Sequence, residues 1–144
     1  HLVQGKLWQG GVRLVSKLPA DLPAVLAKRI PLEQVMINLI SNTCDAYAGM
    51  EEPPPAERRC IAICGKAEGG RVIVQVQDHA GGIPAEILPR IFEPFFTTKD
   101  VGQGTGLGLS ISYGIITEMG GSIMAEAADG GTRFTIELPS APAD

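Results

Sequence analysis

Four glycines recur at every second position, Gly102, Gly104, Gly106 and Gly108, within the stretch FEPFFTTKDVGQGTGLGLSIS that runs from Phe92 to Ser112. Glycine has no Cβ to block close approach of the backbone, and the first N–H groups of a helix have no partner within that helix. A glycine-rich loop that enters a helix therefore suits binding of a phosphate group. The alternative is a mobile surface loop that ends in a helix cap.

The two familiar glycine motifs do not match this stretch. The dinucleotide fingerprint G-x-G-x-x-G would need glycine at position 107 or 109, and both positions are Leu. A P-loop needs Gly-Lys-Ser/Thr, whereas Lys99 precedes the glycines. The spacing thus predicts an anion site of another type.

A row of polar side chains is the second candidate. Residues 31–50, PLEQVMINLISNTCDAYAGM, have the pattern of one long helix that begins near Pro31. One face of this helix would be apolar and suited to a core: Leu32, Met36, Leu39, Ile40, Thr43 and Tyr47. Another face would carry Gln34, Asn38, Asn42 and Asp45, whose oxygens suit a hard cation such as Mg²⁺. A solvated polar face is the alternative, although two asparagines in mid-helix carry a propensity cost.

The third candidate is a carboxylate at the end of a strand. Residues 60–78, CIAICGKAEGGRVIVQVQD, predict a β-hairpin with its turn at Glu68-Gly69-Gly70. Alternation places Asp78 on the same face as the valines of the second strand, toward the core. A buried carboxylate needs a partner, so Asp78 either caps the following loop or accepts a hydrogen bond from a ligand's amino group. His79 is interpreted as a loop residue, because no cluster of His or Cys accompanies it.

The other elements form a simple order along the chain. A strand is predicted over residues 11–18, a short helix over 84–92, and an apolar helix that starts from Gly106 and ends at Gly120-Gly121. Two last strands, 122–128 and 131–139, are joined by Asp129-Gly130. Thr132 has the parity of the inward-facing residues of the last strand, as Asp78 has in its own strand.

Composition narrows the class of protein. The chain has 144 residues, 44% of them apolar, and a mean hydropathy of +0.14, which fits one globular domain. A net charge of −4 without any basic run argues against a nucleic-acid surface. No apolar run reaches a membrane span, and three cysteines without a CxxC pair favour a reduced, cytoplasmic setting. Because the chain begins at His1 and not Met, we expect it to be part of a longer protein.

Taken together in this order, the motifs resemble those of the ATP-binding catalytic domain of sensor histidine kinases, within the Bergerat-fold (GHKL) family. LEQVMINLISNTCDA resembles the N box, VQDHAGGIP the first glycine box, IFEPFFTTK the F box, GQGTGLGLSIS the second glycine box and GGTRFTIELP the closing segment. Each motif alone is weak, but five in order, from about residue 11 to 139, are specific.

The resemblance implies an α/β (α+β) two-layer sandwich, with a mixed β-sheet, helices on one face and a mobile ATP lid. Residues 1–144 would be a single domain with its core at about 11–139 and the lid at about 93–105. The lid would be anchored by Phe92, Phe95 and Phe96. The dimerisation domain that carries the phosphoacceptor would lie outside this chain.

The resemblance also implies roles for single residues. Asp78 would accept the exocyclic amine of adenine, with support from Thr132, and Asn38 and Asn42 would hold Mg²⁺ and the phosphates. Lys99 would stabilise charge on the γ-phosphate. The remaining nucleotide contacts would come from Asp45, Ala46, Gly82, Ile83, Gly104, Thr105, Gly106, Leu107 and Gly108.

The implied function is binding of ATP with Mg²⁺ and donation of the γ-phosphate to a histidine on that separate dimerisation domain. ATP, the dimerisation domain and a downstream response regulator would be its partners, with no nucleic acid and no direct membrane contact. The setting would be cytoplasmic, whether or not the parent protein is anchored in the inner membrane. The alternatives are a GHKL ATPase clamp, an anti-sigma-type serine kinase and a degenerate nucleotide-sensing module.

Two positions depart from the family pattern, and a third differs from the hydrolytic relatives. Ala80 replaces the first glycine of the first glycine box, and Thr43 stands where the N box usually has Ala. Hydrolytic relatives carry a water-activating Glu at the position of Asn38, and Glu33 lies off the polar row. A site that lacks a general base to activate water fits transfer of the phosphoryl group to another nucleophile.

Overall fold

The computed structural model describes residues 11–19, 29–48, 50, 52, 54–55, 58–81, 86–93, 108–128 and 130–140. These residues form five strands, two α-helices and one short 3₁₀ helix. In chain order they are β1 (Arg13–Lys17), α2 (Arg29–Ala48), β2 (Cys60–Glu68), β3 (Arg71–Gln77), the 3₁₀ helix Leu88–Arg90, α3 (Gly108–Glu118), β4 (Ser122–Ala128) and β5 (Gly131–Pro139).

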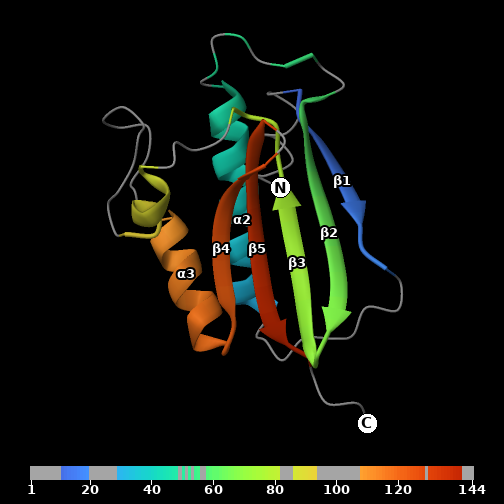
Figure 1. Cartoon of the computed structure of the whole chain (residues 1–144), viewed down its shortest axis with the longest axis vertical. Helices are drawn as coiled ribbons and strands as arrows, with labels where there is room; N and C mark the ends of the chain where they lie inside the picture. Colours follow the sequence, from blue (N-terminus) through green and yellow to red (C-terminus); the bar gives the residue numbers. More distant parts are fainter. Residues whose placement is uncertain are drawn as a thin grey trace.

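The strands form one mixed sheet in the order β1-β2-β3-β5-β4. β1 is parallel to β2, and the other neighbouring pairs are antiparallel. Figure 1 shows α2 crossing behind the sheet and α3 beside β4. The expected architecture, a mixed sheet with helices layered on one face, is confirmed.

The core lies between the sheet and the two helices. Val35 and Leu39 of α2, Ile116 of α3 and Phe134 and Ile136 of β5 are among its fully buried members. Burial of this apolar surface, at roughly 25 cal/mol per Å², is the main term that holds the layers together.

The apolar stripe predicted on α2 is confirmed in part. Its C-terminal members are buried, while Leu32 and Met36 are half-buried against the core. Val35 and Cys44, at the two margins of the stripe, are also buried. The buried arc is wider than predicted because α2 contacts α3 as well as the sheet.

The connections follow the turn signals of the sequence. β2 and β3 are joined at Gly69-Gly70. α3 ends at Glu118 and is followed by Gly120, whose N–H bonds the carbonyl of Thr117 at 3.0 Å. The short helix predicted over 84–92 is a single 3₁₀ turn in its described part, since Pro89 lacks the N–H that an α-helix needs. No helix in the described part of the chain is both long and apolar enough to cross a membrane.

Candidate functional site

Asp78 is a buried carboxylate held by several hydrogen bonds. It follows β3 directly, its side chain is 5% exposed, and its backbone N–H bonds the carbonyl of Thr132 at 3.1 Å. Its Oδ1 accepts the backbone N–H groups of Ala80 and Thr132, both at 3.0 Å, and its Oδ2 accepts the hydroxyl of Thr43 at 3.1 Å. The inward position is confirmed, and the bond from Ala80 shows that this carboxylate does cap its own loop.

Gly131 makes this close packing possible. A Cβ built on Gly131 would lie 2.0 Å from the carbonyl oxygen of Asp78 and 2.6 Å from its Oδ1. Such distances are shorter than any van der Waals contact, and the obstructing atoms are mostly backbone. The backbone of β5 can therefore approach Asp78 only because residue 131 has no side chain.

Gly131→Ala tests this packing. We expect it to lower the free energy of unfolding by about 2–3 kcal/mol, because the strand must move away from Asp78. Urea denaturation measures the effect. Gly114→Ala is the matched control: Gly114 is exposed on α3, and in the described part of the chain no atom lies within 4 Å of its added Cβ, so helix propensity should make that variant more stable by roughly 0.5–1 kcal/mol.

The polar row of α2 has defined partners at its centre. Gln34 Nε2 donates to Asn38 Oδ1 at 2.8 Å, and Asn38 Nδ2 donates to the buried Ser112 Oγ of α3 at 3.3 Å. Asn38 thus links the two helices. Asn42 and Asp45 are half-buried, and among the described residues no hydrogen bond is seen for the side chain of Asn42.

The start of α3 marks the end of the glycine-rich stretch. The helix begins at Gly108, so the repeat does lead into a helix N-terminus as predicted. Phe92 lies half-buried beside this helix, its ring centroid 5.5 Å from that of Tyr113 and 6.4 Å from that of Phe134. The first aromatic residue of the FEPFF run therefore packs on α3 and the sheet.

Tyr47 connects three segments at the end of the sheet where β3 ends. It is 3% exposed, and its hydroxyl accepts the backbone N–H of His79 at 2.8 Å. The same hydroxyl is 3.0 Å from the carbonyl of Cys60 and 3.3 Å from that of Arg58, to either of which it can donate. Burial raises the pKa of Tyr47 above its ordinary value, against the lowering effect of the bond from His79.

This raised pKa predicts a loss of stability in alkaline solution. The unfolded chain releases the tyrosine proton first, near pH 10, so the stabilisation is complete below about pH 10 and is lost as the pH rises through the folded pKa. Between about pH 8 and 11, Tyr47→Phe should therefore lose less unfolding free energy than the wild type. Tyr113→Phe, on the exposed face of α3, should keep the wild-type loss. Equal losses in all three proteins would contradict this account.

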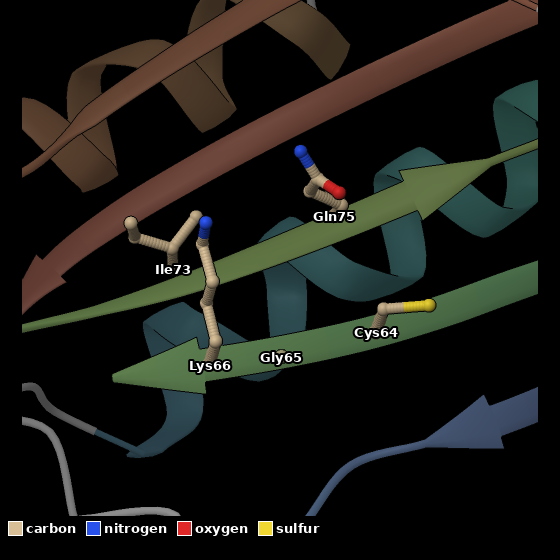
Figure 2. Close-up of a pocket in the computed structure, with 5 residues that line it drawn as sticks. All are labelled: Cys64, Gly65, Lys66, Ile73 and Gln75. Atoms are coloured by element: carbon tan, nitrogen blue, oxygen red, sulfur yellow. The ribbon is translucent and has the colours of Figure 1, made fainter. Parts of the chain in front are cut away.

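A small depression on the sheet is separate from these residues. Figure 2 shows Cys64, Lys66, Ile73 and Gln75 on the face of β2 and β3 turned away from α2, where they line a cavity of about 80 Å³ with Gly65. Small-molecule sites are several times larger, roughly 300–1,000 Å³. Asp78 and the polar row belong to the helical side of the sheet, so this depression is not the candidate site.

The structure gathers some of the predicted site residues and leaves others undescribed. Asp78 and Thr132 are hydrogen-bonded to each other. The helix α2 carries Asn38, Asn42, Asp45 and Ala46, and α3 begins at Gly108. Ala46 is exposed. Lys99, Gly82, Ile83, Gly104, Thr105, Gly106 and Leu107 lie outside the described residues, as do Phe95, Phe96 and nearly all of the predicted lid.

Thr43 and Tyr47 are contacts of this site that the sequence interpretation missed. Both were assigned to the apolar stripe of the helix, which their burial confirms. Their hydroxyls nevertheless bond Asp78 and His79. The signal that could have revealed them is a pair of hydroxyl side chains one helical turn apart on a core-facing stripe, opposite a buried carboxylate.

The described residues hold no group of three or more His, Cys, Asp or Glu side chains that could bind a metal. The oxygens along the polar row of α2 are instead the amide oxygens of Gln34, Asn38 and Asn42, with one carboxylate at Asp45. Amide oxygens suit a hard cation that takes its other ligands from water and from a phosphorylated substrate.

Comparisons with known proteins agree on one family. Residues 27–142 match the model described as "Histidine kinase-, DNA gyrase B-, and HSP90-like ATPase". The chain is 42% identical over 140 residues to the two-component sensor PprA of Pseudomonas aeruginosa, covering 96% of this chain and 15% of that protein. It is 43% identical over 127 residues to the sensor kinase CckA of Brucella abortus, covering 83% of this chain and 13% of that protein.

Solved structures show the same fold. The nucleotide-free catalytic domain of histidine kinase ThkA has a TM-score of 0.78 and 34% identity, with 96% of this chain and 86% of that chain covered. Full-length ShkA in complex with AMPPNP has a TM-score of 0.79 and 27% identity, with 99% of this chain and 28% of that chain covered. This chain spans less than a fifth of the two curated relatives named above.

Proposed function

The chain belongs to the family of histidine kinase-, DNA gyrase B- and HSP90-like ATPases, and from this membership we propose that it binds ATP with Mg²⁺ and donates the γ-phosphate to a histidine. The acceptor histidine lies on a separate dimerisation domain of a two-component sensor kinase. A response regulator downstream then receives the phosphate from that histidine. Because ATP is the donor, the reaction takes place in the cytoplasm. The sensor kinases among the relatives support this proposal.

The observation that carries the proposal is the hydrogen bonding of Asp78. Its Oδ1 already accepts two N–H groups, while the one donor to Oδ2 among the described residues is the hydroxyl of Thr43. A carboxylate offers about four lone-pair sites, so one remains on Oδ2. A single free acceptor beside the core suits the exocyclic amine of adenine.

The residues of α2 fit a magnesium ion. Asn42 and Asn38 present amide oxygens one turn apart, and Asn38 is held in place by Gln34 and Ser112. When bound, the ion would neutralise charge on the phosphates. Gly104 to Gly108 would supply backbone N–H groups to the phosphates. Asp45, Ala46, Gly82 and Ile83 would line the nucleotide, and Lys99 would stabilise charge on the γ-phosphate.

Phosphoryl transfer is favoured over hydrolysis by the absence of a base at one position. Asn38 occupies the place where hydrolytic relatives carry Glu, and an amide cannot take a proton from water. Glu33 is exposed and lies off the polar row. A histidine nucleophile needs little more than positioning and charge stabilisation, which this site can supply.

Transfer to a dimerisation domain supplied as a separate chain tests this function. With ATP labelled at the γ-phosphate, we expect label to move from ATP to the acceptor histidine of the parent's dimerisation domain in the presence of Mg²⁺. A dimerisation domain whose acceptor histidine is replaced by Gln is the control and should stay unlabelled. Release of inorganic phosphate without any labelled acceptor would contradict the proposal and favour an ATPase clamp.

A further inference from the structure

Two hydroxyl groups of α2 hold the segment that carries Asp78. Thr43 and Tyr47 are one helical turn apart, and both are buried, at 2% and 3% exposure. Thr43 Oγ1 donates to Asp78 Oδ2 at 3.1 Å, and Tyr47 accepts the backbone N–H of His79 at 2.8 Å. Figure 1 shows the C-terminal turns of α2 and the end of β3 at the same end of the molecule.

These two contacts complete the anchoring of Asp78 from the helical side. From the sheet side, Thr132 bonds both the backbone and Oδ1 of Asp78. Oδ1 also accepts the backbone N–H of Ala80, so the backbone alone restrains one oxygen of the carboxylate. The hydroxyl of Thr43 adds a bond to Oδ2 itself, and Tyr47 holds the backbone of the next residue along the chain.

Resting on the proposed function, we propose that Thr43 and Tyr47 are positioning residues that hold Asp78 Oδ2 ready for the 6-amino group of a purine. They select a 6-aminopurine over a 6-oxopurine by fixing a single acceptor in one direction. Neither hydroxyl needs to touch the phosphates.

The chemistry of the two bases explains the selectivity. A 6-amino group donates a hydrogen bond to a carboxylate oxygen, whereas a 6-oxo group presents its own lone pairs and is repelled. A guanine or hypoxanthine base could still offer its N1–H if the carboxylate were free to turn. Because Oδ1 is saturated and Oδ2 is held by Thr43, that rearrangement costs hydrogen bonds.

Calorimetric titration of the chain with ADP and with inosine diphosphate tests the inference. Thr43→Val keeps the volume of the side chain and removes the hydroxyl, and Thr43→Ser restores the hydroxyl. We expect Thr43→Val to weaken ADP binding about fivefold, since one net hydrogen bond is lost, and not to weaken inosine diphosphate binding. Thr43→Ser should bind ADP as the wild type does. Thr117→Val, an exposed threonine of α3, is the matched control and should change neither affinity.

Tyr47→Phe provides a second, independent variant. It removes only the hydroxyl, so the N–H of His79 loses its acceptor while the ring keeps its packing. ADP affinity should fall about threefold to tenfold, again without a loss of inosine diphosphate affinity. Tyr113→Phe is its control. If Thr43→Val does not fold, this variant carries the comparison alone.

The outcomes separate this inference from the proposed function. Equal losses for ADP and inosine diphosphate would show a merely structural role and overturn the inference. If Thr43→Val and Tyr47→Phe both bound ADP as the wild type does, the inference would be overturned, while the proposed function would stand. A wild-type chain that binds no ADP would overturn both.

Discussion

Asp78→Asn is expected to weaken ADP binding roughly 5- to 150-fold, equivalent to about 1–3 kcal/mol. The amide would place an N–H₂ group either against the backbone N–H groups that Oδ1 now accepts or against the adenine amine. In both orientations a buried donor is left facing another donor. Calorimetric titration with ADP measures the change.

The control for this variant is Glu126→Gln. Glu126 is an exposed carboxylate on β4, paired with Arg133 at 3.2 Å on the outer face of the sheet. The same chemical change there should leave ADP affinity as it is. A cooperative melting transition would show that the Asp78→Asn variant is folded. If that folded variant bound ADP like the wild type, the proposed contact of Asp78 with adenine would be wrong.

Asn42→Ala should remove the dependence of nucleotide binding on Mg²⁺ and lower phosphoryl transfer by about a hundredfold. The reason is that alanine has no side-chain amide, so the oxygen proposed to hold the ion is lost. Titrations with ADP, each with and without Mg²⁺, give the first quantity, and transfer to the separate dimerisation domain gives the second.

Gln75→Ala makes the same kind of change on the far face of the sheet, where Figure 2 shows the side chain turned away from α2. It should keep both the Mg²⁺ dependence and the transfer rate. A Mg²⁺ dependence that survives in Asn42→Ala would move the ion to other residues of the site.

Local patterns in the sequence predicted most of the elements. The last hairpin, 122–128 and 131–139, is found with the predicted bounds, because alternation and the Asp-Gly turn act over neighbouring residues. The order of strands was not predicted. β5 lies between β3 and β4, and such pairing depends on contacts far apart in the chain that no local period encodes.

The candidate site was predicted to a lesser extent. Parity alone placed Asp78 toward the core, and helical spacing aligned Asn38 with Asn42, so the structure adds mainly their partners. The hydroxyl contacts of Thr43 and Tyr47 were not foreseen, since a buried hydroxyl and an apolar group obey the same periodicity. The need for glycine at position 131 arises from a backbone 53 residues earlier, Asp78, and only the folded structure shows it.

Equilibrium dialysis of the chain against ATP labelled at the γ-phosphate, with Mg²⁺, followed by denaturation, tests the central claim most directly. The claim is that this chain holds ATP and passes its phosphate to a histidine that lies on another domain. We predict about one ATP bound for each chain before denaturation and no label retained on the protein afterwards. A chain that binds no ATP, or one that retains covalent label, would contradict the account.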